Sequence, residues 1–155
     1  MLMQTLQRLF KRDLLKLRNE VESYISEERI WYVEKSISNS AGNLCLHLVG
    51  NLNTYIGSVI AKTNYIRNRE QEFSLRYVPK QELLQMIDDT IEVVQDALKL
   101  VTEEDLTQEY PILVFTEKTT TEFMLVHLAT HLSYHLGQIN YHRRLLDEMR
   151  DVSAA

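Results

Sequence analysis

The chain has 155 residues, 45% of them hydrophobic and 25% charged, which is usual for one globular domain. Its net charge of -5 argues against a nucleic-acid-binding protein, which needs a basic surface for phosphates. No apolar run approaches the roughly 20 residues of a membrane-spanning helix. The single cysteine, Cys45, excludes an internal disulfide, and without a secretory leader we expect a cytoplasmic protein.

Long helices are expected because only 4 glycines and 2 prolines interrupt the sequence. The first predicted helix spans residues 3–26, where apolar residues recur every three or four positions. The second begins among three possible N-caps at residues 38–40 and runs to about Ile66. A polar connection at 68–78 follows, and Pro79 is expected in the first turn of the third helix.

The apolar run at 111–115 is compatible with either a short strand or a buried coil, because length alone does not separate them. The last helix is predicted to start at Thr119, in a capping box with Glu122, and to run to about Met149. Four long helices predict an all-α protein that forms one domain over residues 1–155.

Four of the five histidines lie in the last predicted helix, at His127, His131, His135 and His142. At 100° per residue, all four fall within an arc of about 80°. His131 and His135 are one turn apart, the spacing at which two imidazoles on a helix can bind one ion. His47 lies inside the second predicted helix and can supply a third ligand from a facing helix.

Three neutral imidazoles suit zinc, nickel, copper or iron(II). Three protein ligands leave at least one coordination position open, which is typical of a catalytic metal site. The alternative is that these histidines are ordinary surface or core residues, since a His-x-x-x-His pair by itself often arises by chance.

Three segments resemble motifs of the DinB-like superfamily, which is named for a damage-inducible bacterial protein. Residues 131–139 resemble its His-x-x-x-His-x-Gly-Gln signature, and residues 40–48 resemble its second-helix motif. Residues 67–73 are similar to the Arg-x-Arg-x-x-Glu-Phe run that follows that helix in relatives. The resemblance implies a four-helix bundle with a long crossover connection, and a divalent metal ion such as zinc, nickel or iron. By position, the implied ligands are His47, His131 and His135.

Some members of this superfamily transfer bacillithiol, mycothiol or glutathione onto electrophiles or isomerise maleylpyruvate, and many have no known reaction. The resemblance therefore implies a metal-dependent enzyme that acts on a low-molecular-weight thiol and a small electrophile. A hydrolase would use the same open position to activate water. A non-catalytic metal-binding or stress-response protein and a purely structural bundle are the other hypotheses, and no catalytic residue is assigned.

Two histidines and the cysteine are expected outside the ligand set. His127 is one turn before His131 and is interpreted mainly as a residue that orients other groups. His142 is about 10 Å along the helix from His135, too far to share an ion. Cys45 lies about 200° around the helix from His47 and is predicted to be a core residue.

Other polar residues are weaker candidates for the site. Gln138 can hydrogen-bond a ligand, and Asn51 can line the pocket. Tyr134 can donate to a substrate or pack against its neighbours. Glu70 and Glu72 can act as a general base if their connection closes over the metal. The sequence departs from the superfamily at Leu136, where relatives often carry a second His or an Arg before the Gly-Gln pair.

We expect a homodimer, because members of the superfamily commonly pair through bundle helices. Light scattering should give twice the chain mass of 18.3 kDa. A stable monomer of that mass at every dilution would contradict this prediction.

Overall fold

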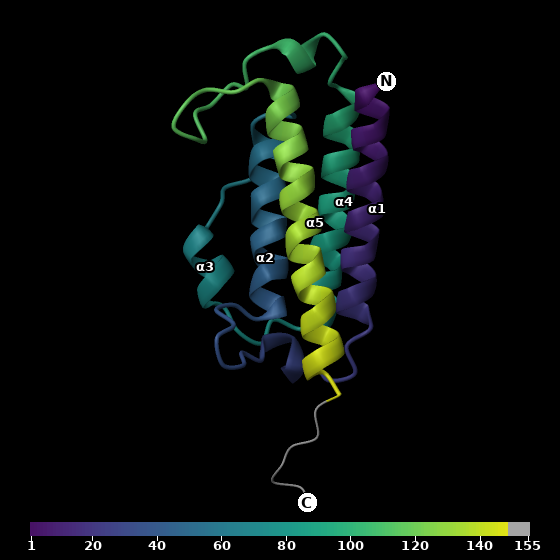
Figure 1. Cartoon of the computed structure of the whole chain (residues 1–155), viewed down its shortest axis with the longest axis vertical. Coiled ribbons are helices and arrows are strands. Elements are labelled where there is room, and N and C mark those ends of the chain that lie inside the picture. Colours follow the sequence, from purple (N-terminus) through teal and green to yellow (C-terminus); the bar gives the residue numbers. More distant parts are fainter. Residues whose placement is uncertain (149–155) are drawn as a thin grey trace, which may run out of the picture.

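The computed structural model describes residues 1–148 and confirms the all-α fold. Four long helices lie side by side as a bundle (Figure 1): α1 (Leu2–Glu22), α2 (Ala41–Leu52), α4 (Lys80–Lys99) and α5 (Thr121–Leu146). No strand forms among the described residues, where an isolated bridge pairs Glu109 with Thr120. None of the described helices combines the length and apolarity needed to cross a bilayer. The predicted helix end at Met149 lies outside the described residues.

A long crossover connection joins α2 to α4. Both helices run upward in Figure 1, so the chain must return the length of the bundle between them. This connection includes the short helix α3 (Arg69–Ser74), which lies against α2 on the outside of the bundle. Helix α2 is therefore covered by α3 as well as by α4 and α5, and nearly all its residues are buried.

Helix α1 illustrates how apolar residues at a helical spacing form one buried face. Its repeated apolar residues are buried against α4 and α5. The fully buried ones include Leu6, Phe10, Leu14, Leu17 and Val21. The predicted end of this helix was too late: α1 stops at Glu22, and a 3-10 turn, η1 (Glu28–Trp31), follows.

The second helix also ends earlier than Ile66. After α2 the chain forms a π-helical segment, η2 (Asn53–Ser58), in which the Val59 N–H donates to the Thr54 carbonyl at 3.0 Å. The Asn53 side chain donates to the Val49 carbonyl at 2.8 Å, which competes with the regular helical bonds. Lys62 then adopts a left-handed φ of 58°, and the helix cannot continue.

Two predicted helix starts shift by one residue. The N-cap of α5 is Thr120 rather than Thr119, and its hydroxyl accepts from the Phe123 N–H at 3.1 Å. Thr119 instead accepts the Tyr110 N–H through its carbonyl at 2.8 Å, so the predicted capping box with Glu122 is wrong. Pro79 is the N-cap of α4 rather than a residue of its first turn. The run at 111–115 is coil, not a strand.

A buried tyrosine and histidine join the ends of α1 and α5. The Tyr24 hydroxyl lies 2.6 Å from His142 Nδ1, and His142 Nε2 lies 2.8 Å from the Tyr32 carbonyl. Because a carbonyl only accepts, Nε2 carries the proton and Nδ1 accepts from Tyr24. Burial lowers the pKa of His142, which keeps the ring neutral in this role. His142 is therefore a core residue that stabilises the end of the bundle where α1 and α5 finish, at the bottom of Figure 1.

Replacing Tyr24 by Phe should lower the free energy of unfolding by about 1–3 kcal/mol, because His142 Nδ1 would remain buried without a donor. Urea denaturation measures this change. The control is Tyr141→Phe on the exposed side of α5, which should change stability by less than about 0.5 kcal/mol. Equal stability of the Tyr24 variant and the wild type would show that this hydrogen bond contributes nothing.

Candidate metal centre

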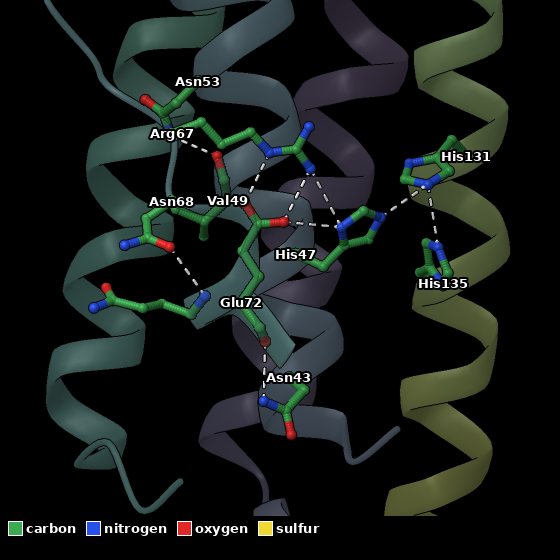
Figure 2. Close-up of polar contacts among 10 residues, drawn as sticks. Asn43, His47, Val49, Asn53, Arg67, Asn68, Glu72, His131 and His135 are labelled. Atoms are coloured by element: carbon green, nitrogen blue, oxygen red, sulfur yellow. Dashed lines mark hydrogen bonds and ion pairs between the residues drawn. The ribbon is translucent and has the colours of Figure 1, made fainter. Parts of the chain in front are cut away.

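Three histidine side chains converge between α2 and α5. Figure 2 shows His47 pointing from α2 toward His131 and His135 on α5. The Nε2 atom of His131 lies 3.2 Å from that of His47 and 3.1 Å from that of His135. One ring nitrogen from each of the three residues lies within 4.8 Å of the others. The structure thus brings together the three residues that the sequence singled out.

The spacing of these nitrogens fits a shared metal ion. Imidazole nitrogens bind zinc at about 2.1 Å, so two ligands are about 3.0 Å apart at a right angle and about 3.4 Å apart at a tetrahedral angle. The two measured separations, 3.1 and 3.2 Å, lie inside this interval. Both contacts of His131 are therefore compatible with nitrogens that share one ion.

The hydrogen-bond partners of His47 and His135 indicate which nitrogen of each ring carries the proton. His47 Nδ1 is 3.0 Å from Glu72 Oε1, and His135 Nδ1 is 2.7 Å from Gln138 Oε1. Both partners accept hydrogen bonds, so each ring carries its proton on Nδ1 and turns an Nε2 lone pair inward. Both lone pairs point at His131 Nε2, which lies 3.2 Å from His47 Nε2 and 3.1 Å from His135 Nε2 and can itself bind a metal ion when it carries no proton.

Burial keeps the α5 pair of histidines neutral. It lowers the pKa of His131 to about 4, with a further contribution from the positive charge that His135 and His47 would carry when protonated. Burial also lowers the pKa of His135, although the hydrogen bond to Gln138 opposes the shift. Both imidazoles therefore offer lone pairs at neutral pH. His131 Nδ1 is buried without a hydrogen-bond partner among the described residues.

A buried carboxylate supports His47 from behind. Glu72, in α3, is 5% exposed and accepts hydrogen bonds from Arg67 at 2.8 and 2.9 Å as well as from His47. Burial would raise the pKa of Glu72, but the hydrogen bonds of His47 and Arg67 outweigh it and the pKa is lowered. The carboxylate is therefore ionised, and it can orient a ligand histidine and increase its basicity.

This position changes the interpretation of the two glutamates. Glu72 contacts His47 Nδ1, on the opposite side of the ring from the nitrogen that faces α5 (Figure 2). It is a positioning residue, and the hypothesis that it acts as a general base has no support from this geometry. Glu70 is exposed on the same helix.

Two further residues of α2 hold Glu72 in place, and sequence reasoning missed both. The Asn43 amide donates to the carbonyls of Glu72 and Leu75, each at 2.9 Å, which ties α3 to α2. Gly50 faces the carboxylate so closely that a Cβ there would overlap Glu72. One signal for the buried carboxylate was present in the sequence. Arg67 and Glu72, in the 67–73 motif, carry opposite charges five positions apart.

The remaining candidates occupy three kinds of position. Gln138 binds His135, as the sequence suggested. His127 lies outside the group of three, with its ring centroid 6.1 Å from that of His131 and 4.8 Å from that of Phe115. Cys45 is fully buried, and burial raises the pKa of its thiol to about 12, which makes it a core residue.

The three other residues that the sequence singled out differ in their exposure. Tyr134 is exposed, and its ring centroid lies 5.3 Å from that of His135. Asn51 is buried one turn beyond His47, and its Oδ1 has no hydrogen-bond partner among the described residues. Leu136, where the sequence departs from the superfamily pattern, is 8% exposed and belongs to the core.

Comparison with known families gives one match over nearly the whole chain. The family whose sequence model matches residues 2–153 is described as a protein of unknown function, DUF1572. A comparison with curated proteins found none that matches.

Replacing Glu72 by Gln should weaken divalent-metal binding by about 10- to 100-fold, because His47 would lose its charged partner. Competition with a chromophoric chelator measures the affinity, and circular dichroism checks that the helices persist. Glu70→Gln is the matched control, since it makes the same change on the exposed side of α3 and should leave affinity unchanged. Equal losses in both variants would mean that general charge, not the contact with His47, matters.

Proposed function

This chain belongs to the DUF1572 family, and we propose that it is a divalent-metal-dependent enzyme of the DinB-like superfamily. The motifs at residues 40–48, 67–73 and 131–139 and the crossover four-helix bundle support that grouping. The proposed metal ligands are His47, His131 and His135. Zinc, nickel and iron(II) are the proposed ions because three imidazoles suit each of them.

One observation carries the proposal: the Nε2 atoms of His47 and His135 both lie at metal-ligand spacing from the Nε2 atom of His131. Among the described residues, no fourth His, Cys, Asp or Glu joins this group. Three protein ligands leave a coordination position for a substrate or water, as in catalytic zinc sites. A structural site would instead be closed by a fourth protein ligand.

An ion bound here would act as a Lewis acid, lowering the pKa of a coordinated thiol or water so that it becomes a nucleophile near neutral pH. The chain's own residues prepare for that role. Arg67 and Glu72 fix the orientation of His47, and Gln138 fixes that of His135. Buried His131 stays neutral, since its pKa is lowered to about 4.

Thiol transfer and hydrolysis are the two reactions that such an open coordination position would support. The thiol would come from solution, because Cys45 is fully buried with a raised pKa and cannot act as the nucleophile. The homodimer and the cytoplasmic location stay predictions.

Metal content tests the ligand set. Wild-type protein dialysed against zinc or nickel should retain about one ion per chain, and His47→Ala, His131→Ala and His135→Ala should each lose it. His127→Ala is the matched control, because this histidine lies next to His131 but outside the converging group. Elemental analysis by mass spectrometry measures the ratio. Loss of metal from the His127 variant, with retention in the His47 variant, would contradict the assignment.

Turnover separates an enzyme from a binding protein. The metal-loaded wild type and the His127 variant should join a low-molecular-weight thiol to an electrophile, while the His131 variant should not. Liquid chromatography of the thiol adduct measures the reaction. Full metal occupancy without turnover of thiols or esters would identify a non-catalytic metal-binding protein and overturn the proposed enzyme.

A further inference from the structure

A pocket of about 670 Å³ lies beside the metal centre, within the 300–1,000 Å³ range of small-molecule sites. It is formed by the C-terminal half of α5, the start of α2 and residues 34–39, which precede α2.

The pocket adjoins the metal centre at His135, one of the three proposed ligands. That residue forms part of the pocket wall, and so does Gln138, whose oxygen lies 2.7 Å from His135 Nδ1. The Tyr134 ring, also in the wall, contacts the His135 ring edge-on at 5.3 Å between centroids. A molecule in this pocket would therefore lie against a residue that holds the ion.

The rest of the lining combines large apolar and aromatic residues with five polar ones, which are Glu34, Ser36, Ser38, Asn39 and His142. Its large apolar residues are Ile37, Leu44, Tyr134, Tyr141, Leu145 and Leu146. Several are unusually exposed for their type: Tyr134, Tyr141 and Leu145 are 65–66% exposed. Such residues on one concave surface are typical of a ligand site.

The charge of the wall selects among ligands. Glu34 is the one acidic residue in the lining, and no lysine or arginine of residues 1–148 belongs to it. The Arg144 guanidinium stacks on the Tyr141 ring at 5.8 Å but is not part of the wall. A carboxylate or phosphate group held against this wall would find no lysine or arginine among the described lining residues, whereas tyrosine faces and a carboxylate favour neutral or cationic groups.

We propose that this pocket binds the aromatic or aliphatic body of a neutral or cationic organic substrate, whose donor atom reaches the proposed metal. The inference rests on the proposed function, and it adds a substrate class to that function. It assigns Tyr141 and Leu145 to substrate binding and Glu34 to selection by charge.

Hydroxamates of different size test the proposal, because they share one metal-binding group. Calorimetry on the zinc-loaded protein should show that benzohydroxamate binds at least tenfold more tightly than acetohydroxamate. Tyr141→Ala should remove most of this preference and leave zinc and acetohydroxamate affinity unchanged. Phe123→Ala is the matched control, since Phe123 is an exposed aromatic of α5 outside the pocket, and should keep the preference.

A charged pair of probes tests the role of Glu34. A benzohydroxamate with a para-aminomethyl group should bind more tightly than one with a para-carboxylate, and Glu34→Gln should reduce the difference.

Equal binding of benzohydroxamate and acetohydroxamate to zinc-loaded protein would overturn this inference and leave the metal site intact. Failure of the wild type to retain zinc would overturn the proposed function itself. If Tyr141→Ala halves the mass of the protein without changing probe binding, the surface is a subunit contact and the inference is wrong.

Discussion

The hydrogen bond between Glu72 and His47 connects the crossover to the centre of the bundle. It spans 3.0 Å between a carboxylate in α3 and a ring nitrogen in α2, and it determines which nitrogen of His47 faces α5. Arg67, from the same connection, neutralises the buried carboxylate. Removing either partner of such a buried pair leaves an uncompensated charge, so the connection and the metal centre are held in place together.

The converging histidines set stability against function in this bundle. The Nε2 lone pairs of His47 and His135 both point at His131 Nε2, which can carry one proton at most, and His131 Nδ1 is buried without a hydrogen-bond partner among the described residues. Ions that bind the folded chain and not the unfolded chain stabilise it. The apolar contacts of α1 with α4 and α5 must offset this unfavourable free energy. The Tyr24–His142 hydrogen bond further stabilises the end of the bundle where α1 and α5 meet.

The sequence predicted the features that depend on local spacing and missed those that depend on tertiary contacts. Apolar periodicity revealed four helices, and the i, i+4 pair on α5 with one histidine on α2 revealed the three converging side chains. The positioning role of Glu72 was not foreseen, because an acidic residue in a polar connection is usually solvated. Only the fold shows that Asn43 and Gly50 make a buried place for it. The end of α2 was misplaced because the left-handed backbone at Lys62 has no signature in the residue itself.

X-ray absorption spectroscopy of the zinc-loaded protein tests the central claim, that three inward-facing imidazoles hold one ion, most directly. The account predicts three imidazole nitrogens at about 2.0–2.1 Å from zinc, completed by light atoms from solvent and without sulfur. The same spectrum should lose its imidazole scattering when any one of the three histidines is replaced. A sulfur ligand, or fewer than three imidazoles around the ion in the wild type, would contradict the account.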